Sequence, residues 1–130
     1  MQPLVTFAAG GAAVHVQYKS APTASEWIAA VRAAAHDPRS HAGMRILLDR
    51  RDVPPPSVTY VLEILGFVRE FQQEFAKCEF ALLVTDKSSL GMAHIGQALL
   101  EPMDLTSTIF TEPDAAMDWL HRRVPDPPRP

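Results

Sequence analysis

The 130-residue chain has a formal net charge of −3 and is 47% hydrophobic, which is typical of a single globular domain. The slight excess of acidic residues argues against a broad basic surface for nucleic acid, and no apolar run approaches the ~20 residues needed to span a bilayer. We therefore expect a soluble, cytoplasmic protein, and its single cysteine, Cys78, excludes an internal disulfide.

Two short runs near the N-terminus, residues 4–7 and 14–18, alternate apolar and polar side chains and predict two strands. The pair Gly10-Gly11 lies between them, and glycine accepts the positive φ angles of a tight turn, so we expect a β-hairpin. Thr23, followed three residues later by Glu26, matches a capping box and predicts the start of an amphipathic helix.

The rest of the chain alternates between strands and helices. Continuous apolar runs at 44–48 and 80–84 suit interior strands, which are covered on both faces. The other predicted elements are helices over about 57–76 and 88–100, an edge strand over 105–111 and a final helix from Pro113. This order predicts an α/β fold, with a single mixed, mostly parallel sheet of four to five strands, an N-terminal hairpin and about four helices. The domain is expected to cover 1–123, followed by a disordered proline-rich tail, 124–130.

Three segments of the chain carry a resemblance to a known family. They are the strand 45–49 ending in aspartate, the strand 80–86 followed by Gly91-Met92-Ala93, and Ile109-Phe110 followed by the helix 115–120. In these segments the chain resembles the SpoIIAA-like proteins, relatives of the STAS domain (sulfate transporter and anti-sigma factor antagonist). The resemblance covers roughly residues 3–121. It implies a four- or five-stranded sheet with helices packed on it, and no established activity.

The segment after the first interior strand departs from the pattern of the STAS relatives. Those relatives act as phospho-switches through an Asp-Ser-Ser-Gly motif at the start of the following helix. This chain has Pro55-Pro56-Ser57-Val58-Thr59 there, and Ser57 lacks the flanking serine and glycine. We therefore expect a non-enzymatic regulatory or protein-interaction module without the usual phospho-serine motif.

Charged residues follow both interior strands. Asp49 ends the first and Asp86 follows the second, so parallel strands would bring both carboxylates to the carboxyl edge of the sheet, where open α/β folds bind ligands. The two could form a magnesium site or an acid/base pair. Alternatively, Asp86 caps the next helix and Asp49 pairs with Arg50 or Arg51.

The start of the predicted 88–100 helix also resembles an anion site. Free N–H groups, two hydroxyls and a lysine could hold a phosphate or carboxylate, whereas ordinary N-capping by Ser88 is the alternative. His94 fits either a proton-dependent role or an ordinary place as a solvated or capping histidine. The candidate site for a small apolar or anionic ligand consists of Asp49, Arg50, Arg51, Asp86, Ser88, Ser89 and His94.

An aromatic stripe on the predicted 57–76 helix forms the second candidate surface. Its members are Tyr60, Phe67, Phe71 and Phe75. The stripe fits either a broad core contact with the sheet or an interaction face for a dimer partner or an apolar ligand. The five histidines show no metal-ligand spacing, and the chain lacks both the G-x-G-x-x-G of dinucleotide folds and the G-x-S-x-G elbow of serine hydrolases. We therefore expect no metal, no cofactor and no catalytic residues. The expected partner is an unidentified protein, including a second copy of the chain, or a small ligand.

Overall fold

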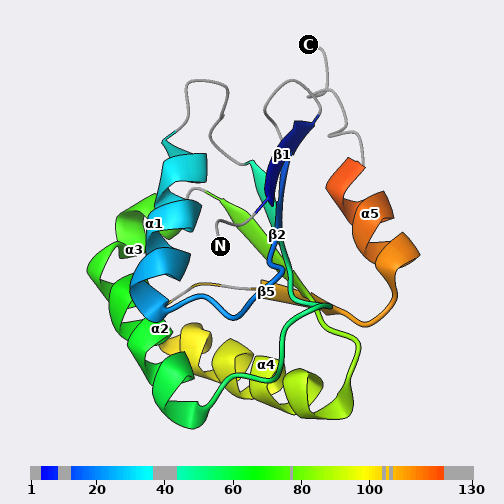
Figure 1. Cartoon of the computed structure of the whole chain (residues 1–130). Coiled ribbons are helices and arrows are strands. Elements are labelled where there is room, and N and C mark those ends of the chain that lie inside the picture. The colour runs from blue at the N-terminus through cyan, green and yellow to red at the C-terminus, as the bar shows by residue number, and fades with distance from the viewer. Residues whose placement is uncertain are drawn as a thin grey trace.

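Five strands form one sheet in the order β1-β2-β3-β4-β5 (Figure 1). The computed structural model describes residues 4–8, 13–36, 44–76, 78–103, 105 and 107–121. The strands are β1 (Leu4–Ala8), β2 (Ala13–Gln17), β3 (Arg45–Asp49), β4 (Glu79–Leu83) and β5 (Ser107–Phe110). Only β1 runs antiparallel to its neighbour, which confirms the predicted mixed sheet with its N-terminal hairpin. The predicted turn at Gly10-Gly11 and the tail 124–130 lie outside the described residues.

Helices connect the parallel strands, as the alternating sequence pattern predicts. They are α1 (Ala24–Ala35), α2 (Val58–Glu70), α3 (Gln72–Phe75), α4 (Lys87–Leu100), the short 3-10 helix η2 (Glu101–Met103) and α5 (Pro113–His121). The predicted capping box at α1 is present, because Thr23 Oγ1 accepts from the Glu26 N–H and the Glu26 carboxylate accepts from the Thr23 N–H. In the described part of the chain, no helix has the length and apolar character needed to cross a membrane.

The single helix predicted over 57–76 is two helices in the structure. Phe71, with φ −109° and ψ 28°, leaves the helical conformation and separates α2 from the one-turn α3. After this break Phe75 is buried against Trp27 and Phe80, with ring centroids 6.4 and 5.2 Å away. Helical periodicity runs through the break without interruption, so the sequence pattern did not reveal it.

The two faces of the sheet are covered unequally. Successive strand residues point to opposite faces, so Ile46 and Leu48 pack under α1, α2 and α3, whereas Leu47 packs under α5. The larger core thus lies on the side of α1 to α4. Among the described helices, α5 alone covers the other face, on the right in Figure 1. β3 is buried on both faces, as its continuous apolar run predicts, whereas β4 is buried on the α5 side and half-buried at Phe80 and Leu82 on the other.

Candidate functional site

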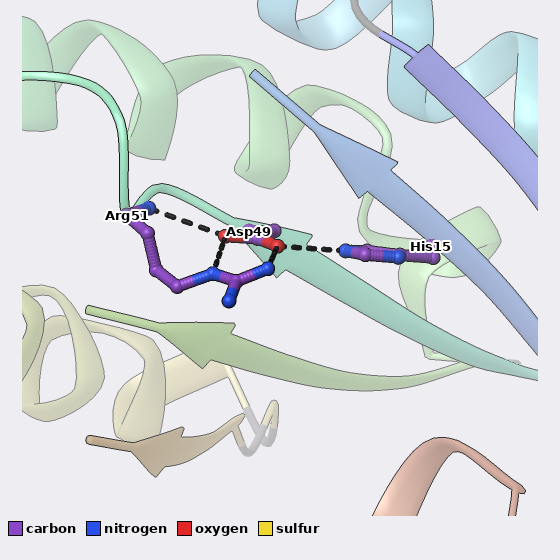
Figure 2. A network of polar contacts seen from close by, with 3 residues as sticks. All are labelled: His15, Asp49 and Arg51. Carbon is purple, nitrogen blue, oxygen red and sulfur yellow. Dashed lines mark hydrogen bonds and ion pairs between the residues drawn. The ribbon is translucent and has the colours of Figure 1, made fainter. Parts of the chain in front are cut away.

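Asp49, the last residue of β3, lies at the centre of a buried polar network on the α5 side of the sheet (Figure 2). Its side chain is 1% exposed. Oδ1 accepts from the Arg51 N–H at 3.2 Å and from Arg51 Nε at 3.0 Å; Oδ2 accepts from an Arg51 terminal nitrogen at 2.7 Å and from His15 Nε2 at 2.8 Å. Four donors thus saturate this carboxylate, in line with the prediction that Asp49 pairs with a neighbouring arginine.

Strand register brings His15 into this network. In the parallel pair of β2 and β3, His15 lies opposite Leu47, so it shares a face with Asp49 two residues further on. A carboxylate only accepts hydrogen bonds, so His15 Nε2 carries the proton in this contact. Burial raises the pKa of Asp49, but the hydrogen bonds from His15 and Arg51 outweigh burial and hold that pKa well below its usual value. Asp49 is therefore an ionised acceptor at neutral pH.

Arg50 points to the opposite face of the sheet. It follows Asp49 in an extended segment, and its side chain lies with that of Leu48 on the face covered by α2 and α4. Its backbone N–H donates to the Leu83 carbonyl at 3.0 Å, which ties the end of β3 to β4. The residue is 7% exposed, and its guanidinium lies 5.8 Å from the centroid of the Tyr60 ring. Arg50 and Arg51 are adjacent in sequence, yet their side chains lie on opposite faces of the sheet.

Arg50 lines a cavity of about 140 Å³ between α2, α4 and the sheet. Apolar side chains from all three elements form most of the wall, including Ile64, Leu65, Phe80, Leu82, Met92 and Leu100. The small residues Ala93 and Gly96 face it from α4, and a Cβ placed on Gly96 would meet no atom within 4 Å. The cavity is thus an apolar space with a cationic group at one end.

Two tyrosine hydroxyls lie in the surroundings of Arg50. In the part of the chain that the structure describes, the buried hydroxyls of Tyr18 and Tyr60 donate to no acceptor, and the Arg50 guanidinium is the donor nearest to the Tyr60 oxygen. Burial raises the pKa of both tyrosines, and the positive charge of Arg50 opposes that rise at each. Both hydroxyls are therefore protonated at neutral pH and can donate.

The residues around the start of α4 have separate roles. Asp86 is the N-cap and accepts from the Ser89 N–H at 2.9 Å, which corrects the prediction of capping by Ser88. Hydrogen bonds from the hydroxyl and N–H of Ser89 lower the pKa of Asp86. Ser88 is exposed, Ser89 is buried against the cavity, and His94 is exposed on α4 outside the cavity wall.

The predicted aromatic interaction face does not form an exposed patch. Tyr60 lines the cavity, Phe67 packs against the core, and Phe75 is 5% exposed. Phe71 is covered by Arg32, whose guanidinium carbon lies 3.8 Å from the ring centroid. These contacts favour the alternative interpretation of the stripe, a broad core contact.

Comparison with known proteins adds no functional assignment. The chain matches no family model, no curated protein and no solved structure. Within the described ranges, no group of three or more His, Cys, Asp or Glu side chains has the arrangement of a metal site. The proposed function therefore depends on the geometry of this chain alone.

The structure divides the candidate ligand residues into three places. Asp49 and Arg51 lie with His15 on the α5 side, Arg50 and Ser89 face the cavity, and the remaining three are exposed at or along α4: Asp86, Ser88 and His94. Sequence reasoning missed His15, Tyr18 and Tyr60 as members of polar clusters. Period-two alternation on β2 and β3 was the available signal for His15, since it places that side chain on the face of Asp49.

Proposed function

We propose that this protein is a binding module for a small apolar ligand, held between α2, α4 and the sheet. The observation that carries the proposal is the cavity of about 140 Å³ with its largely apolar wall. An apolar cavity of about 150 Å³ in another protein is large enough to bind benzene. Ligand pockets are typically apolar with a few placed polar groups, and this cavity has that composition.

The position of the cavity supports the same function. Arg50 and Ser89 lie at the carboxyl ends of β3 and β4, where ligands of open α/β sheets bind. Small residues of α4, Ala93 and Gly96, leave the space unfilled. A larger residue at either position would close it. A binding role is also consistent with Asp49 and Asp86, whose carboxylates are each engaged by their own partners.

A cavity-filling substitution tests the proposal. Toluene, as a neutral apolar probe, is expected to shift the amide resonances of α2 and α4 in a two-dimensional NMR titration and to raise the melting temperature, because it binds only the folded state. Gly96→Leu should abolish both responses by occupying the cavity. Gly91→Leu is the matched control, because Gly91 lies on the same helix, is exposed, and has no atom within 4 Å of an added Cβ.

The two glycine variants gain the same helix propensity. A difference between their responses to toluene therefore reflects occupation of the cavity by the new side chain and not a change in helix stability. A toluene response that is absent from the wild type, or that persists unchanged in Gly96→Leu, would remove the basis for the proposal. Native mass spectrometry of the purified protein adds a direct test, because a retained ligand appears as an added mass.

Protein interaction is the second candidate function. Among the described residues, four of the five exposed large apolar side chains lie on α2 and α4, which contact each other: Val58, Leu62, Ile95 and Leu99. Exposed apolar groups gathered on neighbouring helices favour an interaction surface. Sedimentation velocity is expected to show concentration-dependent association that Leu62→Glu abolishes. A wild-type monomer at all concentrations would argue against self-association.

We also retain the relationship to SpoIIAA-like proteins as a proposal, supported by the order of strands and helices. In this chain Ser57 is the N-cap of α2, where its Oγ accepts from the Tyr60 N–H at 3.1 Å. A capping role accounts for this serine without a phospho-switch. Mass spectrometry of the purified protein should therefore find no stoichiometric phosphate on Ser57, and its presence would favour the switch mechanism.

A further inference from the structure

Among the described residues, Arg50 of the cavity wall lies near two tyrosine hydroxyls and has no carboxylate partner. The guanidinium carries five N–H groups, and the hydroxyls of Tyr18 and Tyr60 add one O–H each. Within the described ranges, no carboxylate forms an ion pair with Arg50, and neither hydroxyl donates to an acceptor. A buried charge is costly unless it is paired, so this cluster calls for an acceptor from outside the described residues.

Two further polar residues of the cavity wall, Ser89 and Gln97, form hydrogen bonds within the chain. The Ser89 N–H donates to the Asp86 carboxylate at 2.9 Å, and Gln97 Nε2 donates to the Ser107 carbonyl at 2.6 Å. Glu26 and Glu63, the carboxylates that act on Tyr60, are both exposed. Among the described residues of the wall, Arg50 and the Tyr60 hydroxyl are therefore the polar groups placed to bind a ligand.

We propose that the ligand is a monocarboxylate with an aromatic or short alkyl body, its carboxylate bound by Arg50 and the Tyr60 hydroxyl. This inference rests on the proposed function and adds the chemical class of the ligand. The planar guanidinium matches a carboxylate in a bidentate fork, while the apolar wall takes the hydrocarbon. One cation balances one negative charge, which favours a monoanion over a phosphate dianion.

Ligands of matched length show how much of the binding depends on the charge of the ligand and how much on its shape. Hexanoate and hexanamide have the same length and differ in charge, and hexylphosphonate brings a phosphate-like head. In NMR titrations hexanoate should bind the wild type about 10- to 100-fold more tightly than hexanamide, because a hydrogen bond to a charged group contributes more than a neutral one. Hexylphosphonate should bind more weakly than hexanoate, and tighter binding of hexylphosphonate would overturn the assignment of a monocarboxylate.

Variants then test Arg50 itself. Arg50→Met should abolish the preference for hexanoate and leave hexanamide binding within about twofold, since the apolar wall is unchanged. Arg69→Met is the control: Arg69 lies exposed near the end of α2, and its loss changes the net charge by the same amount. Tyr60→Phe, which removes one buried hydroxyl and keeps the ring, should weaken hexanoate binding and spare hexanamide. This variant also covers the case that Arg50→Met fails to fold.

Failure of the inference is distinguishable from failure of the proposed function. Equal binding of hexanoate and hexanamide, unaffected by Arg50→Met, would overturn the carboxylate assignment and leave apolar binding intact. Absence of binding by hexanoate, hexanamide and toluene alike would overturn both. A hexanoate preference that Arg69→Met also abolishes would assign it to net charge and overturn the role of Arg50.

Discussion

Replacing Asp49 by asparagine is expected to destabilise the protein by about 3 kcal/mol, although the side chain keeps its size. Oδ1 survives the change and still accepts from Arg51. Oδ2 becomes an amide nitrogen that cannot accept from the Arg51 terminal nitrogen at 2.7 Å, and that can bond to His15 Nε2 at 2.8 Å only as a neutral donor after a change of the His15 tautomer. The variant therefore loses two charge-assisted hydrogen bonds and creates no cavity.

The size of the expected destabilisation follows from the burial of the Asp49 carboxylate and the exposure of its partners. A hydrogen bond to a charged group contributes about 1.5–3 kcal/mol, so two give about 3–6 kcal/mol. The partners recover some hydration after the change, because the side chains of Arg51 and His15 are 32% and 16% exposed. The lower end of that range, about 3 kcal/mol, is therefore expected, above the 0–1 kcal/mol of an exposed ion pair.

Urea denaturation at neutral pH measures the difference, with the free energy of unfolding extrapolated linearly to water. Glu79→Gln is the control, since Glu79 is 64% exposed and its carboxylate lies 3.3 Å from Arg45 Nε on the neighbouring strand. That variant should cost less than about 1 kcal/mol. If Asp49→Asn costs no more than Glu79→Gln, the network of His15, Asp49 and Arg51 does not stabilise the fold as argued.

Three further outcomes are expected. Because the pKa of Asp49 in the folded protein lies below its value of about 3.9 in unfolded chains, its contribution is present above about pH 4 and is lost as the pH falls further. Urea titrations between about pH 4 and pH 2 should therefore show a smaller loss of stability in Asp49→Asn than in the wild type, and equal losses would contradict this linkage. Asp86→Ala should lower the free energy of unfolding by about 1 kcal/mol and Ser88→Ala by less than about 0.5 kcal/mol; the reverse order would place the N-cap of α4 on Ser88. Phe75→Ala should cost about 3–5 kcal/mol and exposed Leu62→Ala about 0.5 kcal/mol or less, and similar losses would contradict the burial of Phe75.

Local patterns were sufficient to predict most of the fold. The spacing of Thr23 and Glu26 predicted the start of α1, and the two continuous apolar runs predicted the interior strands β3 and β4. Each of these signals depends on hydrogen bonds or burial within a few neighbouring residues, which is why the sequence alone reveals them. The sequence did not predict the helix break at Phe71, because the same apolar periodicity fits one long helix or two shorter ones.

The candidate site depends on contacts between distant segments. His15 and Asp49 are 34 residues apart, and only the parallel register of β2 and β3 brings them within 2.8 Å. The charged run after β3 looked like one edge site in the sequence, yet strand alternation sends Asp49 and Arg50 to opposite faces. The cavity exists because α2 and α4 are packed on the sheet with small residues between them. That spacing is a property of the assembled core, which no single segment of the sequence contains.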